Sequence, residues 1–477
     1  MTPTIMIAVL VVYFIVLIFI SKLTSNDDGN DSFFTGKRQS PWYVVAFGMI
    51  GASLSGVTFV SVPGWVATSQ FSYFQMVLGY LVGYTVIATV LLPLYYRLNL
   101  TSIYGYLEER FGYWSYKSGA FYFLLSRIVG ASFRLFLVAN ILQILVFDSW
   151  GIPFALTVVL TISFIWVYTH KAGLKTIIWT DTLQTLFMIL AVVLCFYHIS
   201  NALNFTMSDA INQISLSEYS KIFFLEDSNS SLFFPKQFLA GAFIAIVMTG
   251  LDQDMMQKNL SCRSLKDAQK NMFWFSIVLV LVNLLFLGLG ALLYIHADHF
   301  NIQASGDDLF AAVAMHESMP VVVGLFFLLG LIAAAYSSAD SALTSLTTSF
   351  CIDILGIENK PITQQIRIRK QSHLFFSAVL FIVILVFKWI NDESVVAALF
   401  KVAGYTYGPL LGMYAFGLLT PWRIRDKWIL PVVLSSPIIC YYLQLKAPVW
   451  WGFEFGFELL VVNGLLCFLG MVFIRQK

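Results

Sequence analysis

The sequence predicts an all-α membrane protein with thirteen transmembrane helices, and three observations lead to this prediction. Only 11% of the 477 residues are charged and 59% are hydrophobic, whereas a soluble domain has about a quarter charged residues. Apolar runs of the roughly 20 residues that a helix needs to cross a bilayer recur along the chain. Lysine and arginine concentrate in alternate loops, which is typical of multi-pass membrane proteins.

The apolar runs, divided at polar and helix-breaking residues, give thirteen segments in chain order. They cover residues 4–21, 41–67, 72–96, 118–147, 152–170, 173–199, 236–257, 272–297, 320–353, 373–391, 394–420, 428–445 and 451–474. The first segment could be taken for a signal peptide, but it lacks a basic start and a small-residue cleavage pattern. The longest polar stretch, residues 200–235, has room for one short amphipathic helix, and no soluble domain is expected.

The basic residues predict the orientation. If the N-terminus is outside, the inner loops contain 21 lysines and arginines, Lys258 among them, and the outer loops contain four. Arg127, Arg134 and Lys401 then fall within helices. The positive-inside rule therefore predicts that the N-terminus is outside and the C-terminus is in the cytoplasm. We expect the membrane to be the bacterial inner membrane.

The second segment is expected to be a broken helix. Several glycines and hydroxyl residues lie between Gly48 and Thr58, and Pro63-Gly64 follows. A helix broken at the membrane midplane frees carbonyls that can coordinate a cation. A face of small residues that packs against another helix is the alternative.

The ninth segment has a face of hydroxyl groups. Positions 334, 337, 338, 341 and 345 share one side of the helix, and four of them are serines. Sodium, a hard cation, prefers oxygen ligands of this kind. Serines can also bond only to the carbonyls of their own helix, but the neighbouring carboxylate of Asp340 favours a cation site.

Three charged residues stand out within the apolar segments. Asp181 is either a solvated cap or a group on an ion pathway. Arg127 and Arg134 lie two turns apart on one face, so that Arg127 could reach the membrane interface while Arg134 lies deeper. Burying a guanidinium costs at least ~2.5 kcal/mol, so Arg134 needs a carboxylate, a cluster of carbonyls or an anionic ligand.

Four ordered motifs resemble the sodium:solute symporter family, which includes sodium–glucose, sodium–proline and sodium–sialic acid carriers. Residues 172–184 are similar to its GGLKAVxWTDxxQ segment and residues 250–268 to its TDQxxxQRxLSAKSLKDA loop. Residues 337–340 and 404–412 match two further motifs. The resemblance covers nearly the whole chain.

The resemblance implies a leucine-transporter-like fold, an inverted repeat of five plus five helices. Residues 41–199 would form the first repeat and residues 236–420 the second. An extra N-terminal helix and cytoplasmic loop (1–40), an extracellular loop (200–235) and two C-terminal helices (421–477) would complete the chain.

The resemblance also implies where sodium binds. The family's shared sodium site, carried over by motif, consists of Gly51, Leu54, Ala334, Ser337 and Ser338. Some members bind a second sodium, and the matching residues are Asp181, Ser337, Asp340 and Ser341. The family has a hydroxyl group at position 340, so Asp340 either strengthens a cation site or takes a proton, and the stoichiometry stays open.

Arg134 resembles the arginine with which sialic acid carriers hold the substrate carboxylate. Ser53, Ser55 and Thr58 fall where those carriers contact substrate hydroxyls, whereas the polar pattern of the glucose carriers is absent. We therefore expect sodium-coupled symport of an acid sugar such as sialic acid, or of another organic acid, into the cell by alternating access. A symporter of a neutral sugar or polyol, and a transporter-like sensor without coupled flux, are the alternatives.

Other classes of protein fit the sequence poorly. It has neither an H-E-x-x-H motif nor a G-x-S-x-G motif, so an enzyme is not expected. The five cysteines lack metal-ligand spacing, and there is no repeated pore loop of a channel. The expected partners are the solute, sodium as the only metal ion, and membrane lipid, with no nucleic acid and no obligate protein partner.

Overall fold

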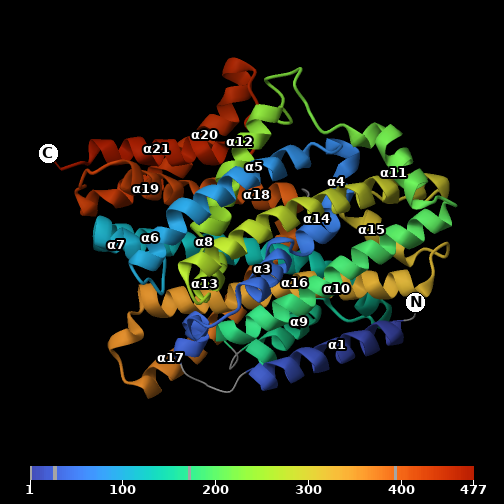
Figure 1. Ribbon diagram of the computed structural model, residues 1–477, viewed down its shortest axis with the longest axis horizontal. Helices are drawn as coiled ribbons and strands as arrows, with labels where there is room; N and C mark the ends of the chain where they lie inside the picture. Colours follow the sequence, from blue (N-terminus) through green and yellow to red (C-terminus); the bar gives the residue numbers. More distant parts are fainter. Residues whose placement is uncertain (1–2, 25–29, 170–172, 391–394, 477) are drawn as a thin grey trace.

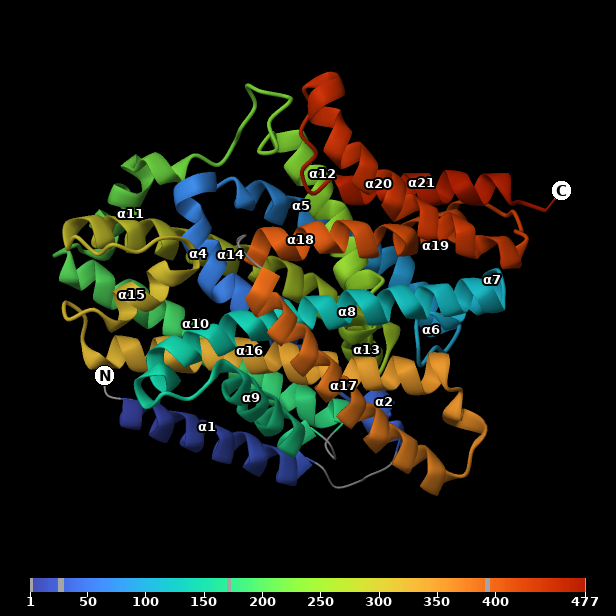
Figure 2. The same ribbon diagram turned by 180° about the vertical axis from the view of Figure 1, so that it is seen from behind.

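The computed structural model describes residues 3–24, 30–169, 173–390 and 395–476, which are almost entirely helical. Most of the long helices run roughly along the long axis of the molecule (Figures 1 and 2). The start of α1 (Pro3–Thr24) and the end of α21 (Leu459–Phe473) lie at opposite ends of this axis. Ala172, which opens one of the motifs, lies outside the described residues.

Eight helices in the described ranges are long and apolar enough to cross a membrane, and two bent pairs raise this number to as many as ten. The eight are Thr4–Thr24 in α1, Tyr73–Arg97 (α5, η2 and α6), Tyr113–Trp150 (α8, η3 and η4), Gly173–Ala202 (α10), Leu265–His299 (α14), Val321–Ile354 (α16 and η8), Ile362–Ile390 (α17) and Asp426–Trp451 (η10 and α20). The bent pairs are α3 (Trp42–Ser53) with α4 (Gly56–Ser69), and α12–η6 (Phe234–Gly250) with α13 (Gln253–Leu260).

Three shorter apolar helices are α9 (Phe154–Thr169), α19 (Gly408–Leu419) and α21, and α18 (Val395–Thr406) precedes α19. Each of the thirteen expected segments therefore contains a helix. The number that crosses the membrane stays a prediction, because length and composition alone identify the spans.

The connections contain several short helices. They are α2 (Asn30–Thr35), η1 (Gly36–Arg38), α7 (Gly105–Arg110), α11 (Met207–Leu216), η5 (Glu218–Ser220), η7 (Gly306–Asp308), α15 (Leu309–Met315) and η9 (Ile357–Asn359). The amphipathic helix expected in residues 200–235 is α11, which begins with a capping box between Thr206 and Asp209. Hydrogen bonds from Thr206 lower the pKa of the exposed Asp209 carboxyl below its usual value.

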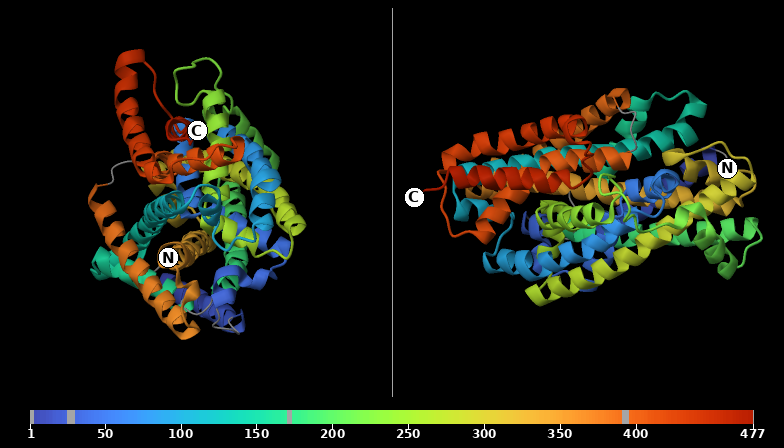
Figure 3. Two further views of the ribbon diagram at one scale, coloured as in Figure 1. Left: turned by 90° about the vertical axis from the view of Figure 1, so that its left-hand side faces the viewer. Right: turned by 90° about the horizontal axis from the view of Figure 1, so that it is seen from above.

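The serine-bearing helix α16 lies in the middle of the bundle. All its residues from Gly330 to Ser349 are buried, and it packs against α10, α8 and α3. Helices α1, α17 and α20 lie at the periphery (Figure 3). Large apolar side chains on them, such as Trp389 and Val449, are largely exposed, as expected for a surface that faces lipid.

The second segment is broken, as predicted. Helices α3 and α4 meet at an angle of 53° around Leu54 and Ser55. A second break, which the sequence reading missed, bends α12–η6 against α13 by 64°. There the Asp252 carboxylate accepts hydrogen bonds from the amides of Asp254 and Met255 and starts a new helix. Its sequence signal is Gly250 followed by a capping aspartate.

Candidate solute and cation sites

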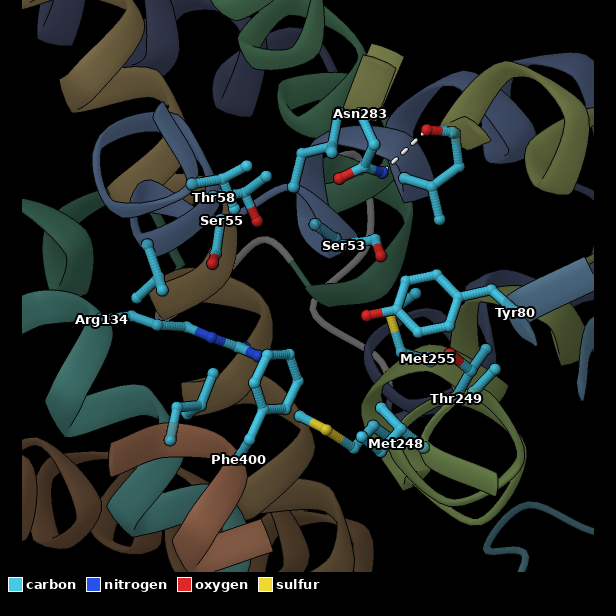
Figure 4. A pocket seen from close by; sticks show the side chains of 18 of the residues that line it. Ser53, Ser55, Thr58, Tyr80, Arg134, Met248, Thr249, Met255, Asn283 and Phe400 are labelled. Carbon is cyan, nitrogen blue, oxygen red and sulfur yellow. Dashed lines mark hydrogen bonds between the residues drawn. The ribbon is translucent and has the colours of Figure 1, made fainter. Parts of the chain in front are cut away.

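A cavity beside the first break brings together all four residues predicted to bind the solute. Ser53 and Ser55 come from the break, Thr58 from α4 and Arg134 from α8. Figure 4 shows their side chains around the cavity. The other polar residues of the wall are Tyr73, Tyr80, Tyr84, Arg127, Thr249 and Asn283.

Arg134 is a buried cation without a counter-charge. Its exposed fraction is 8%, its Nε has no hydrogen-bond partner, and it forms no ion pair with any residue in the described ranges. The buried carboxylates of Asp181 and Asp340, which could have compensated it, are bonded to Lys258 and Tyr168. A guanidinium that is buried in this way is expected to bind an anionic ligand.

Arg127 has a different environment, and the expectation that it could reach the membrane interface is wrong. Its side chain is buried and forms ion pairs with Asp254 and, at 3.8 Å, with Asp252. Tyr407 donates a hydrogen bond of 2.5 Å to the same Asp252. Both aspartates lie at the second break, so these ion pairs depend on a bend that was not predicted from the sequence.

Asp181 is neither solvated nor free. It is fully buried and forms an ion pair of 2.7 Å with Lys258, and the Ser337 hydroxyl donates to its other oxygen at 2.6 Å. The assignment of Lys258 to an inner loop is therefore wrong, because this residue lies within α13 with an exposed fraction of 1%. A buried carboxylate requires such a partner.

The remaining residues of the predicted second sodium site bond elsewhere in this conformation. Asp340 accepts hydrogen bonds from the Tyr168 hydroxyl at 2.9 Å and from the Ser341 amide at 2.5 Å. The Ser341 hydroxyl donates to Asp254. Of the four predicted residues, only Asp181 and Ser337 are joined by a hydrogen bond between side chains.

The residues of the predicted shared sodium site lie on α16 and on α3, with Leu54 directly after the last residue of α3, and the two helices pack together. The Ser338 hydroxyl on α16 is buried and has no hydrogen-bond partner. No side chain in the described ranges donates to the carbonyls of residues 51–55, where α3 ends. A Cβ atom at Gly51 would overlap Thr185 of α10, so glycine is required for this close approach.

The second break differs from the first because side chains occupy its carbonyls. The Tyr95 hydroxyl donates to the Gly250 carbonyl at 2.8 Å, and the Tyr104 hydroxyl donates to the Leu251 carbonyl at 3.0 Å. Gln253 bonds the backbone of Ile103 and of Thr101, each at 2.9 Å. Carbonyls freed by a helix break are thus already satisfied by side chains here, whereas no side chain in the described ranges donates to those of the first break.

Sequence reasoning missed several residues of the cavity wall. Asn283 carried a usable signal, because a polar residue within a long apolar segment of a membrane protein indicates function. Tyr80, Thr249 and Phe400 carried none, since they line the cavity only through the packing of α5, η6 and α18. No group of three or more histidine, cysteine, aspartate or glutamate residues in the described part of the chain could hold a metal ion.

Comparison with known proteins extends these observations. Residues 33–420 match the model of the sodium:solute symporter family. The sodium/sialic acid symporter NanT of Aliivibrio fischeri is 24% identical over 427 residues, which cover 86% of this chain and 82% of that protein. Sodium-coupled monocarboxylate transporter 1 of Mus musculus is 26% identical over 404 residues, 82% of this chain and 64% of that protein.

Two solved structures share the fold. A substrate-bound, outward-open Na+-coupled sialic acid symporter superimposes with a TM-score of 0.84, covering 99% of both chains at 19% identity. Mhp1, a nucleobase-cation-symport-1 family transporter, does so with a TM-score of 0.59, covering 94% of this chain and 96% of that chain at 13% identity. The family match spans most of the chain, and the chain therefore belongs to the sodium:solute symporter family, whose members are sodium-coupled transporters and not enzymes.

Proposed function

We propose that this symporter uses sodium to carry a small organic acid, with an acid sugar such as sialic acid as the leading example. One observation carries the proposal: Arg134 is buried in the cavity wall without a counter-charge among the described residues. A carboxylate on the solute would pair with its guanidinium and compensate the buried charge.

The surroundings of Arg134 support an anionic solute. Helix α4 starts at Gly56 beside the cavity, and its N-terminus carries a partial positive charge. The hydroxyls of Ser53, Ser55 and Thr58 would bond polar groups of the same solute. The relatives named above carry sialic acid or monocarboxylates, and both of these solute types bear a carboxylate.

We propose the shared sodium site at Gly51, Leu54, Ala334, Ser337 and Ser338. The unpartnered Ser338 hydroxyl and the carbonyls at the end of α3 supply neutral oxygens, which suit a hard monovalent cation. A second sodium at Asp181, Ser337, Asp340 and Ser341 would have to compete with Lys258 for Asp181.

We further propose thirteen spans in an inner bacterial membrane, with the N-terminus outside and the C-terminus inside, arranged as an inverted repeat. Residues 41–199 and 236–420 would form the two halves, flanked by residues 1–40, 200–235 and 421–477. Two observations support this arrangement: a broken helix begins each half, and the chain ends lie at opposite ends of the bundle, as an odd number of spans requires.

Uptake into proteoliposomes tests the function. An inward sodium gradient should drive uptake of labelled N-acetylneuraminate or another carboxylate, and replacing sodium by choline should abolish it. Transport of a neutral sugar in place of every acid tested would favour the neutral-solute alternative. Sodium-dependent binding without any uptake would favour a sensor.

A further inference from the structure

The wall of the cavity contains a second buried polar group with an unpartnered atom, the side-chain amide of Asn283. Asn283 lies on α14, lines the cavity and has an exposed fraction of 2%. Its Nδ2 donates a hydrogen bond of 2.8 Å to the Leu279 carbonyl, one turn earlier on the same helix. Its Oδ1 has no hydrogen-bond partner.

The orientation of this amide follows from its surroundings. An asparagine amide presents one acceptor and two donor hydrogens. Because the Leu279 carbonyl can only accept, the nitrogen must face it, and the oxygen is left as the free group. A buried acceptor without a partner costs about as much as a lost hydrogen bond, so an O–H or N–H group placed in the cavity would satisfy it and stabilise the complex.

Asn283 and Arg134 approach the cavity from different helices, α14 and α8. In Figure 4 Arg134 lies at the left and Asn283 at the top, with the side chains of Ser53 and Ser55 at a height between them. The wall thus offers a cation at one side and an acceptor at another. A solute that meets both needs a carboxylate and, remote from it, a hydroxyl or amide N–H.

We infer that Asn283 is a specificity-determining residue that accepts a hydrogen bond from such a group, and that the substrate is a hydroxylated or amidated acid. This inference rests on the proposed function. It separates the sugar acids, which carry such donors, from simple monocarboxylates, which have none beyond the carboxyl group. A site built to bond a donor rejects an analogue that lacks it, because its acceptor then stays buried and unpaired.

Binding to the purified protein, measured by isothermal titration in sodium chloride, tests the inference. D-gluconate and hexanoate both have a six-carbon chain ending in a carboxylate, and only gluconate carries hydroxyls on the other carbons. N-acetylneuraminate serves as a larger hydroxylated acid. We expect the wild-type protein to bind at least one hydroxylated acid about tenfold or more tightly than hexanoate, as one neutral hydrogen bond allows.

Asn283→Leu removes the acceptor with little change in volume and should reduce this preference about tenfold. Ser276→Ala, on the same helix but outside the cavity wall, should leave it unchanged. Any of three results overturns the inference. The first is an unaltered preference in Asn283→Leu, the second is a wild-type protein that binds hexanoate as tightly as both hydroxylated acids, and the third is a wild-type protein that binds neither gluconate nor N-acetylneuraminate. If Asn283→Leu does not fold, the wild-type comparison decides alone. The proposed function fails separately, if Arg134→Lys leaves the binding of every acid unchanged.

Discussion

Replacing Ser338 by alanine isolates one ligand of the proposed sodium site. The Ser338 hydroxyl is buried and forms no hydrogen bond with the described protein, so Ser338→Ala breaks no hydrogen bond within it. Without sodium, the free energy of unfolding should stay the same or rise, since an unsatisfied buried hydroxyl is removed. With sodium, the variant loses one oxygen ligand. We estimate that loss at ~1.4 kcal/mol, which is about a tenfold weaker apparent sodium affinity.

The assay is thermal unfolding of the purified protein across a sodium titration, with choline to hold the ionic strength. Stabilisation by a ligand grows with the logarithm of its concentration over its dissociation constant. The curve for Ser338→Ala should therefore shift to about tenfold higher sodium. Sodium-dependent uptake should shift in the same way.

Thr344→Val provides a matched control. Thr344 lies on the same helix, and its hydroxyl is also buried without a hydrogen-bond partner, but it does not belong to the proposed site. This variant should keep the wild-type sodium dependence. Equal sodium affinity in wild type and Ser338→Ala would refute the assignment, and an equal loss in both variants would show that the effect is not local.

Three further predictions follow from the buried charges. Arg134→Lys keeps the charge but loses the planar guanidinium. Titration calorimetry should show a ten- to a hundredfold weaker affinity for an acidic solute, equivalent to roughly 1.4–2.7 kcal/mol, with sodium binding intact. Normal transport of a neutral solute by this variant would mean that the arginine is structural. Lys258→Met leaves Asp181 uncompensated and should lower the free energy of unfolding, measured with denaturant, by about 3–5 kcal/mol. Adding Asp181→Asn to this variant should restore most of the lost stability. Strictly additive losses from the two substitutions would contradict the pairing. If a second sodium binds beside Asp181, Asp181→Asn should reduce the sodium ions coupled per solute from two to one in reversal-potential flux measurements, and a wild-type ratio of one would exclude that site.

Hydropathy and the positions of glycines predicted much of the fold. Each expected segment contains a helix because long apolar runs must satisfy their backbone groups internally. The first break was predictable, since glycines and hydroxyl residues gather within one segment. The second was missed because its signal, Gly250 followed by the capping Asp252, is short and local.

The candidate site was predictable wherever one helix carries its residues. Ser337 and Ser338 share a helical face, and Arg134 stands out as a charge in an apolar segment. The ion pairs of Arg127 and Lys258 were not predictable, because they join positions 127 and 77 residues away in the chain. Such pairs depend on how helices pack, which periodicity within one segment does not reveal.

The hydrogen bonds at the second break have a mechanical consequence. The Gln253 side chain forms hydrogen bonds with the backbone of residues 101 and 103, and the Tyr104 hydroxyl donates a hydrogen bond to the carbonyl of Leu251. The start of α13, together with Leu251 just before it, is therefore tied to the segment 101–104 by three bonds, each worth about 0.5–1.5 kcal/mol. A tilt of α13 during the transport cycle must either carry this segment with it as a rigid unit or break all three bonds. As long as the three bonds hold, strain applied at the N-terminal end of α13 reaches the segment that leads into α7 (Gly105–Arg110).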